Sequence, residues 1–299
     1  MRTYQDTRGR RWHLIQEGYA SLYLALHRDT RAYAEEIVKR RDLALSRIRE
    51  TFGTVWEGCE LLEIGCGQHC PSSFAFGAKN SVTAIDLDVV PRLRHPLTYA
   101  ELLRTNGLYR CVKTIIRQAL GVDRRERRAL ADMLGGSVNW PRVYRMDAQG
   151  LAFDDATFDG AFSFATFEHI PDVRRAMQEL RRVVKPGGTI YIVPELFTCV
   201  TGCHDPRLWT NVRSLPLWAH LRPAYAGLVR PNVYINRLRM GDYQSLAREV
   251  FGDVQFYFEE HGTRRFLDEL TPKERAELAG YSDCELCTQD LVILAQVPY

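Results

Sequence analysis

The sequence has no long hydrophobic run, which argues against a membrane-spanning helix. No stretch of the 299 residues approaches the roughly 18 consecutive apolar residues that such a helix needs. The polar and basic start, MRTYQDTRGRRWHL, also lacks an apolar core followed by a small-residue cleavage site, so it does not resemble a secretory signal peptide. We therefore expect a cytoplasmic protein.

Strong charge of one sign and a disulfide framework are also missing. The formal net charge is +3, which gives no electrostatic reason to expect nucleic-acid binding, and no basic-aromatic nucleic-acid module is visible. The eight cysteines are spread along the chain, several of them within apolar runs, as is typical of reduced cysteines. With 45% hydrophobic residues, the chain is long enough to bury a full core.

Short apolar runs alternate with helical patterns over most of the chain. We expect strands at 59–67, 81–88, 143–148, 158–165, 189–195, 254–261 and 290–298, and helices at 10–50, 97–136, 172–184 and 242–252. This alternation predicts an α/β, Rossmann-like, seven-stranded, mostly parallel sheet with helices on both faces. We divide the chain into an N-terminal helical cover, 1–55, and a domain, 56–299, with insertions 97–136 and 196–237 that form a substrate lid.

Two glycines follow the first expected strand. Gly65 and Gly67 end the run LLEIGCG, and glycine at such a point allows a tight turn and lets a ligand lie against the backbone. The third glycine of the Gly-x-Gly-x-x-Gly pattern is absent, because position 70 is Cys70. This departure argues against the pyrophosphate binding of an NAD-type protein.

Acidic residues follow the first three expected strands. Glu63 precedes the glycines, Asp86 lies 19 residues after Gly67, and Asp147 with Ala148 ends the third strand. A carboxylate can accept hydrogen bonds from a ribose diol, and a carboxylate beside a backbone amide can bind an adenine edge. Since open α/β sheets bind ligands outside the carboxyl ends of their strands, we expect the three acids to line one crevice.

Residues 60–194 resemble the class I S-adenosylmethionine-dependent methyltransferases, and among these the group called methyltransferase type 11. The matching stretches are LLEIGCGQH, AIDLD and MDAQGLAFDDATFDGAFSFATFEHIPDVRRAMQELRRVVKPGGTIYIV; Ala152 stands where the family commonly has proline. The resemblance implies S-adenosyl-L-methionine as cofactor. It places Glu63, Gly65 and Gly67 at the methionine end, Asp86 at the ribose, Asp147 with Ala148 at the adenine, and Ser163 with Phe164 beside the cofactor or the transferred methyl.

Three residues are candidate catalytic groups, because an oxygen or nitrogen acceptor can need a base near neutral pH. His169 follows the fourth strand, Glu195 ends the fifth, and His204 lies in the aromatic insertion 196–237. Each histidine also has a structural alternative: His169 as a helix-start or packing residue, and His204 in a loop capped by Asp205.

Two further patterns leave alternatives open. Cys199, Cys203, Cys284 and Cys287 have spacings that could supply a zinc site, although isolated thiols are more often buried apolar groups, and we expect no metal. In Tyr109–Gly121 apolar residues and the basic residues Arg110, Lys113 and Arg117 fall on separate helical faces, and four more arginines follow up to residue 128. This segment either contacts an anionic membrane or an acidic acceptor, or packs on the domain with its basic face solvated.

The sequence thus predicts methyl transfer to a small-molecule or glycan-type acceptor, with oxygen as the first expectation for the methylated atom. Two other classes stay open: a non-catalytic S-adenosylmethionine-binding protein, and an NAD-binding oxidoreductase. The sequence contains no pattern that identifies the acceptor, the pathway or the oligomeric state.

Overall fold

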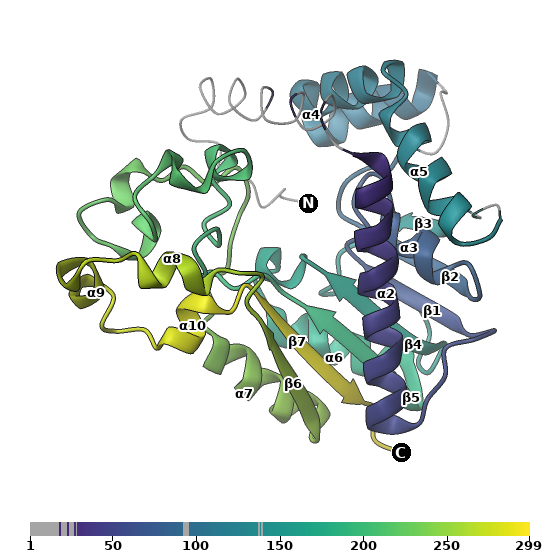
Figure 1. Cartoon of the computed structure of the whole chain (residues 1–299). Coiled ribbons are helices and arrows are strands. Elements are labelled where there is room, and N and C mark those ends of the chain that lie inside the picture. The colour runs from purple at the N-terminus through teal and green to yellow at the C-terminus, as the bar shows by residue number, and fades with distance from the viewer. Residues whose placement is uncertain are drawn as a thin grey trace.

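One seven-stranded sheet organises this computed structural model, which describes residues 29–91, 96–136, 138 and 140–299 and the single residues 18, 23 and 27 (Figure 1). The strands are β1 (Glu60–Ile64), β2 (Ser81–Asp86), β3 (Arg142–Arg145), β4 (Phe158–Phe164), β5 (Val184–Val193), β6 (Val254–Glu259) and β7 (Asp290–Gln296). Their order is β3-β2-β1-β4-β5-β7-β6, and β7 runs antiparallel to both neighbours. The predicted Rossmann-like, mostly parallel sheet is confirmed.

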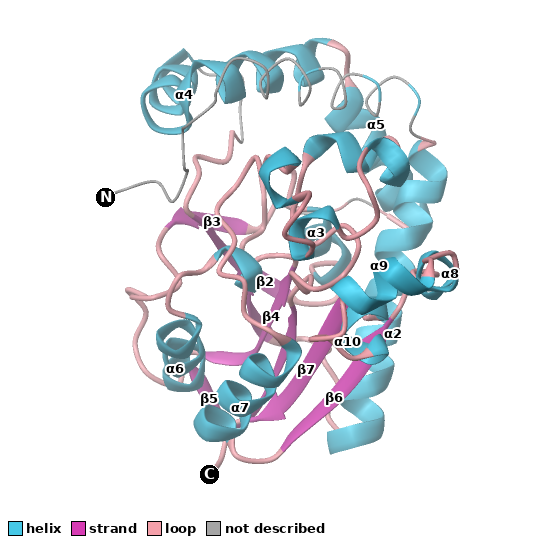
Figure 2. Ribbon diagram, turned by 90° about the vertical axis from the view of Figure 1, so that its left-hand side faces the viewer, coloured by secondary structure: helices cyan, strands magenta, loops and turns pink. Residues whose placement is uncertain are grey.

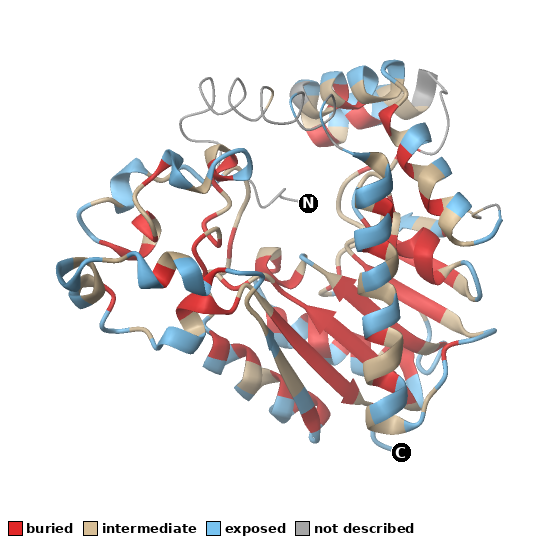
Figure 3. Ribbon diagram, viewed as in Figure 1, coloured by how far each residue is buried: buried red, intermediate tan, exposed pale blue. Residues whose placement is uncertain are grey.

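Helices cover both faces of the sheet (Figures 1 and 2). On one face α6 (Val173–Val183) and α7 (Met240–Phe251) share a buried apolar cluster with the central strands. On the other face lie α2 (Thr30–Phe52), α3 (Pro71–Phe76) and α5 (Val122–Met133), which pack on one another and on β1 and β2. Figure 3 shows the resulting concentration of buried residues in the strands, with the outer side of α2 exposed.

The described part of the expected helix 10–50 is α2. It begins after Asp29, whose side chain accepts hydrogen bonds from the backbone N–H groups of Arg31 and Ala32, and it ends at Gly53 with φ +69°. Most of 10–28 lies outside the described residues. The division at residue 55 therefore stays a prediction.

The motif Lys185-Pro186-Gly187-Gly188 lies at the start of β5, which follows α6 without a loop. The helix ends at Val183 and the strand begins at Val184, five residues earlier than expected. Gly187 has φ +77° and donates its backbone N–H to Val297 O at 2.8 Å. A Cβ on Gly188 would lie 2.7 Å from Asp159 O, so this motif is held by close backbone packing.

The two insertions differ from each other in structure. The first forms α4 (Pro96–Ala119) and α5, and α4 is kinked at Gly107, where φ is 84°. The second contains four short 3₁₀ helices, η2 (Pro206–Trp209), η3 (Val212–Ser214), η4 (Ala219–Leu221) and η5 (Ala226–Leu228).

Among the described helices, none combines the length and the apolar character needed to cross a bilayer.

A second segment, not expected from the sequence, completes the lid. Between β6 and β7 the chain forms α8 (Arg264–Asp268), α9 (Pro272–Glu277) and α10 (Asp283–Cys287), which Figures 1 and 2 place beside the 196–237 insertion. Trp218 and Leu221 pack in one cluster with Leu267, Leu278 and Leu286. We call residues 196–237 and 260–289 together the lid lobe.

Candidate active site

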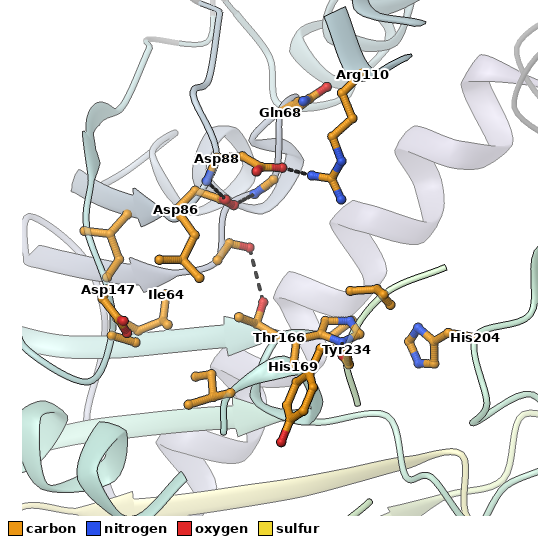
Figure 4. Close-up of a pocket in the computed structure, with 18 of the residues that line it drawn as sticks. Ile64, Gln68, Asp86, Asp88, Arg110, Asp147, Thr166, His169, His204 and Tyr234 are labelled. Carbon is orange, nitrogen blue, oxygen red and sulfur yellow. Dashed lines mark hydrogen bonds and ion pairs between the residues drawn. The ribbon is translucent and has the colours of Figure 1, made fainter. Parts of the chain in front are cut away.

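A cavity of about 480 Å³ lies at the carboxyl ends of the parallel strands (Figure 4). Its size is within the range of about 300–1,000 Å³ that is usual for small-ligand sites. Three walls surround it. The donor wall comes from the loops after β1, β2 and β3 and includes Gly65, Gly67, Asp86, Asp147 and Ala148; the lid wall includes His204, Trp209, Asn232 and Tyr234; the α4 wall includes Arg110 and Lys113.

The glycine loop lies directly against the end of β4. Gly65 has φ +75°, and a Cβ there would lie 2.1 Å from Thr166 Oγ1. The Thr166 hydroxyl donates to Gly65 O at 3.3 Å, and Gly65 N–H donates to Ile85 O at 2.8 Å. Only glycine fits this position, and the loop backbone therefore forms part of the cavity surface.

Asp86 is held at the end of β2 by backbone groups. Its carboxylate accepts from Gly67 N–H and from Asp88 N–H, both at 2.8 Å. Burial raises the pKa of Asp86 to about 6, although the hydrogen bond from Gly67 and the charge of Arg110 lower it. Each carboxylate oxygen has a second lone pair, so Asp86 can still accept hydrogen bonds from a ligand.

Asp147 and Ala148 lie on the donor wall beside Asp86. Asp147 Oδ1 accepts from the backbone N–H and from Nε2 of Gln149, both at 2.9 Å. Figure 4 shows Asp86 and Asp147 on the same side of the cavity. The sequence expectation that strand-end acids meet here agrees with this arrangement for two of the three acids.

Glu63, Ser163 and Phe164 are not among the residues that line the cavity, in contrast to the sequence expectation. Glu63 is buried behind the glycine loop, where it accepts a hydrogen bond from Ser73 of α3, and burial raises its pKa to about 8. Ser163 donates to Ile64 O at 2.9 Å, and Phe164 stacks on Phe76.

The residues directly after β4 that do line the cavity are Ala165, Thr166, His169 and Ile170. His169 belongs to the short 3₁₀ helix η1 (Phe167–His169). Ser163 and Phe164 are neighbours on β4 and therefore point to opposite faces of the sheet. Phe164 packs on Phe76 of α3, and Ser163 is held against β1 by its hydrogen bond to Ile64 O.

His169 and His204 face each other at the junction of the donor and lid walls (Figure 4). Their rings meet edge to face, with centroids 4.9 Å apart. His169 Nδ1 lies 2.8 Å from Tyr234 O, so Nδ1 carries the proton and Nε2 is left with its lone pair. Burial lowers the pKa of each imidazole to about 4, which keeps both neutral at pH 7.

Glu195 lies behind His204 and does not line the cavity. Its Oε1 accepts from the Thr201 hydroxyl at 2.7 Å, and its Oε2 lies 3.5 Å from His204 Nε2. Burial raises the pKa of Glu195. The structure therefore brings all three candidate catalytic residues together, with the two histidines toward the cavity.

The α4 wall places basic side chains inward. Arg110 and Lys113 line the cavity, and Arg110 forms an ion pair with Asp88. Arg117 forms ion pairs with Asp123 and Glu126 of α5 at 2.9 and 3.0 Å. In α4 it is therefore the apolar face that is exposed, through Leu103, Leu108, Val112, Ile115, Ile116 and Leu120. Further along the segment, Arg124, Arg125 and Arg128 of α5 are exposed as well.

Several cavity residues were not anticipated from the sequence. Thr166, Asn232 and Tyr234 had no motif to mark them, although Thr166 directly follows the fourth expected strand. Among the described residues, the two groups of three or more side chains that could hold a metal are Glu168-His169-His204 and Glu259-His261-Asp290. Neither contains a cysteine, so the cysteine spacings do not correspond to a zinc site there.

The chain is similar to several curated methyltransferases. Residues 100–192 match a family model described as a methyltransferase domain. Sterol 4-C-methyltransferase strm-1 of Caenorhabditis elegans is 35% identical over 51 residues, 17% of this chain and 15% of that protein. O-methyltransferase rstn1 of Aspergillus nomiae is 35% identical over 80 residues, 27% of this chain and 33% of that protein. The matched region thus spans a third or less of these curated relatives.

Solved structures show a more distant likeness over most of the chain. The YcgJ protein of Bacillus subtilis has 16% identity and a TM-score of 0.43, and the match covers 86% of this chain and 99% of that one. Phosphoethanolamine N-methyltransferase 2 of Haemonchus contortus, solved with S-adenosyl-L-methionine, has 15% identity and a TM-score of 0.44, over 86% of this chain and 52% of that one. At such TM-scores the likeness identifies no substrate.

The methyltransferase-domain match covers β3, β4, α6 and nearly all of β5, and the glycine loop and Asp86 precede it on neighbouring strands of the same sheet. Over residues 100–192 the chain is therefore similar to a methyltransferase domain, and this region lies on a Rossmann-like sheet.

Proposed function

We propose that this chain transfers the methyl group of S-adenosylmethionine to an oxygen atom of a small-molecule or glycan-type acceptor. The observation that carries the proposal is the continuity of the cavity. It joins a donor wall of glycine loop and strand-end acids to a lid wall that presents two histidines. A donor and an acceptor bound on these two walls would meet beside His169.

The donor wall fits the chemical groups of S-adenosylmethionine. Asp86 has lone pairs left for the ribose hydroxyls, and Asp147 with the Ala148 backbone can hydrogen-bond the adenine edge. The open space beside Gly67, where nothing lies within 4 Å of a Cβ position, leaves room for the methionine end. When bound, the cofactor supplies a methyl group on a positively charged sulfur.

For methyl transfer, the lid wall has to hold the acceptor oxygen about 3 Å from the methyl carbon and in line with the C–S bond. The oxygen lone pair forms the new C–O bond, the C–S bond breaks with its electron pair left on sulfur, and the hydroxyl proton departs. His169, Glu195 and His204 are the candidate groups for this step. With pKa values of about 4, however, the two histidines are weak bases at pH 7.

Two observations bear on the acceptor. Several curated relatives are named O-methyltransferases, among them a protein of Pyrenophora dematioidea that is 28% identical over 118 residues, 40% of this chain and 42% of that protein. Arg110 and Lys113 on the α4 wall favour an anionic acceptor. The exposed apolar face of α4 supports a further element of the proposal, peripheral contact of the 109–128 region with a membrane.

The proposal is tested first by calorimetric titration with S-adenosylhomocysteine and, separately, with NAD. We expect S-adenosylhomocysteine to bind and D86N to weaken it at least about tenfold, because the amide removes charge-assisted acceptors for the ribose. Binding of NAD alone would refute the proposal.

Incubation with methyl-labelled S-adenosylmethionine and fractionated host metabolites, followed by mass analysis, then identifies the acceptor. A labelled O-methyl product supports the proposal. Cofactor binding without transfer to any fraction favours the alternative of a non-catalytic binding protein.

A further inference from the structure

Buried polar atoms without hydrogen-bond partners gather in one place. Among the described residues they include both carboxylate oxygens of Glu168, Oδ1 of Asn232 and Nε2 of His204, whose one neighbouring carboxylate oxygen is Glu195 Oε2 at 3.5 Å. Buried polar groups in folded proteins almost always have partners, and a bound ion often supplies the partner where the protein itself does not. Since His204 and Asn232 both line the cavity, this cluster points to a ligand there.

Glu168 is the most deeply buried member of the cluster. It is 1% exposed and lies in η1, which follows β4. A buried carboxylate is normally paired or bound to a metal, because leaving it unpaired costs several kcal/mol.

His169 is oriented toward this carboxylate, and His204 lies beside His169. The hydrogen bond from His169 Nδ1 to Tyr234 O leaves Nε2 facing Glu168, 3.7 Å from its Oε1. A carbonyl that accepts from the far nitrogen of a metal-binding histidine is the usual way to fix the tautomer. His204 has φ +51°, a left-handed conformation that is uncommon for histidine and that holds its ring beside His169.

We infer that Glu168, His169 and His204 form a binding site for a divalent transition-metal cation, such as Zn²⁺, Mn²⁺ or Fe²⁺, in the wall of the active-site cavity. One ligand atom from each residue lies within 4.8 Å of the others. Tetrahedral donors about 2.1 Å from an ion lie about 3.4 Å apart, so a small inward shift completes the site. Two imidazoles and one carboxylate suit these ions better than Mg²⁺ or Ca²⁺.

The position of the site also suggests its role, which rests on the proposed function. The histidines line the cavity and Glu168 lies behind them, so the open side of the ion would face the acceptor. There it would bind an acceptor hydroxyl and lower the hydroxyl pKa, so that the proton can leave to solvent without a strong protein base.

The second group of three offers a natural control. Glu259, His261 and Asp290 satisfy one another: His261 Nε2 lies 3.0 Å from Asp290 Oδ2 and 3.4 Å from Glu259 Oε2, and Arg47 adds an ion pair to Glu259 at 2.6 Å. With these partners, His261 is held as a cation, with its pKa raised to about 10. A protonated histidine does not bind metal, so this group should not compete.

The test is calorimetric titration of the metal-stripped full-length protein with Zn²⁺ and Mn²⁺, with the visible absorption of added Co²⁺ as a structural readout. We expect binding tighter than about 1 mM with one ion per chain. E168Q and H204N should each weaken binding by about 100-fold or more and remove the Co²⁺ bands, since even outer-shell changes cost 10- to 100-fold. H204N is chosen because asparagine tolerates the left-handed backbone at that position.

H261N should bind metal as the wild type does. Absence of binding in the wild type, unchanged binding in both E168Q and H204N, or loss in H261N alone would each overturn the inference. Circular dichroism checks folding, and if one ligand variant is unfolded the other decides. The titration needs no methyl donor, so it fails or succeeds independently of S-adenosylhomocysteine binding, which E168Q should retain.

Discussion

At the residue scale, Gly65 and Gly67 have equal weight in the sequence motif but different surroundings in the structure. Both have positive φ, whereas only Gly65 would bring a Cβ against Thr166; at Gly67 nothing lies within 4 Å. We expect G67A to lower the free energy of unfolding by about 1 kcal/mol, through backbone strain alone. G65A should cost about 2–3 kcal/mol more, because overpacking is added.

Urea denaturation measures both variants. The double variant G65A/T166A removes the two Thr166 atoms nearest the added methyl, at 2.1 and 2.3 Å, and should recover part of the loss. Equal destabilisation by G65A and G67A would show that the contact with Thr166 does not matter.

Asp86 gives the site a dependence on pH. Its pKa is raised to about 6, chiefly by burial, and only the ionised form accepts hydrogen bonds with both oxygens. We expect affinity for S-adenosylhomocysteine to be constant from pH 8 to about 6.5 and to fall below pH 6, by no more than about tenfold per pH unit for one proton. Titration calorimetry at stepped pH measures this, and D86N should bind weakly with no such step.

Residue-level prediction from the sequence succeeded where geometry follows from strand order. Asp86 and Asp147 were expected at the cavity because carboxyl ends of parallel strands share one edge, and both lie there. Glu63 was expected beside them and faces Ser73 instead. The alternation of side chains along a strand predicts two opposite faces. It does not reveal that a short helix, α3, covers the face on which Glu63 lies.

At the element scale, α4 shows the same limit. Its separate apolar and basic faces were visible in the sequence, but not which face turns inward. The orientation is set by acids from other elements, Asp88 after β2 and Asp123 and Glu126 of α5, which pair with Arg110 and Arg117. Such partners lie outside the helix and cannot be found from its periodicity.

This orientation makes a test of membrane contact possible. Ile115 and Ile116 are 47% and 45% exposed on α4, and burying such side chains at a bilayer surface is favourable. We expect the protein to sediment with vesicles of mixed phosphatidylcholine and phosphatidylserine, and I115E/I116E to reduce the bound fraction about fivefold or more. L43E, at a similarly exposed leucine of α2, is the matched control and should bind as the wild type does. Equal binding by all three proteins would exclude contact through α4.

At the scale of the whole molecule, the lid lobe joins two segments separated by a helix and a strand. The aromatic residues and prolines of 196–237 predicted that this segment is an insertion. No pattern in the sequence predicted that residues 260–289 pack against it. The packing of Trp218 on Leu286, and the ion pairs that cross the lobe, depend on long-range contacts that no local pattern encodes.

Arg222 is the polar centre of that lobe. It is 2% exposed, and its guanidinium forms ion pairs with Glu277 at 2.7 Å and Glu274 at 3.2 Å on α9 and lies over the ring of Tyr225. R222M should lower the free energy of unfolding by about 3 kcal/mol, because it leaves the glutamates without their buried cation. R213M is the control: Arg213 pairs with Glu269 across the same lobe but is 58% exposed, so its loss should cost less than about 1 kcal/mol.

The same pair of variants separates the roles of the lid and donor walls. Arg222 does not line the cavity, and its side chain donates to Leu217, Glu274 and Glu277, all within the lid lobe. R222M should therefore leave S-adenosylhomocysteine affinity within about twofold while it speeds proteolytic cleavage in 196–237, because local opening follows local stability. A matching loss of cofactor affinity would mean that the lid lobe and the Rossmann-like sheet unfold as one unit, and the lid could not then exchange acceptors independently of the bound donor.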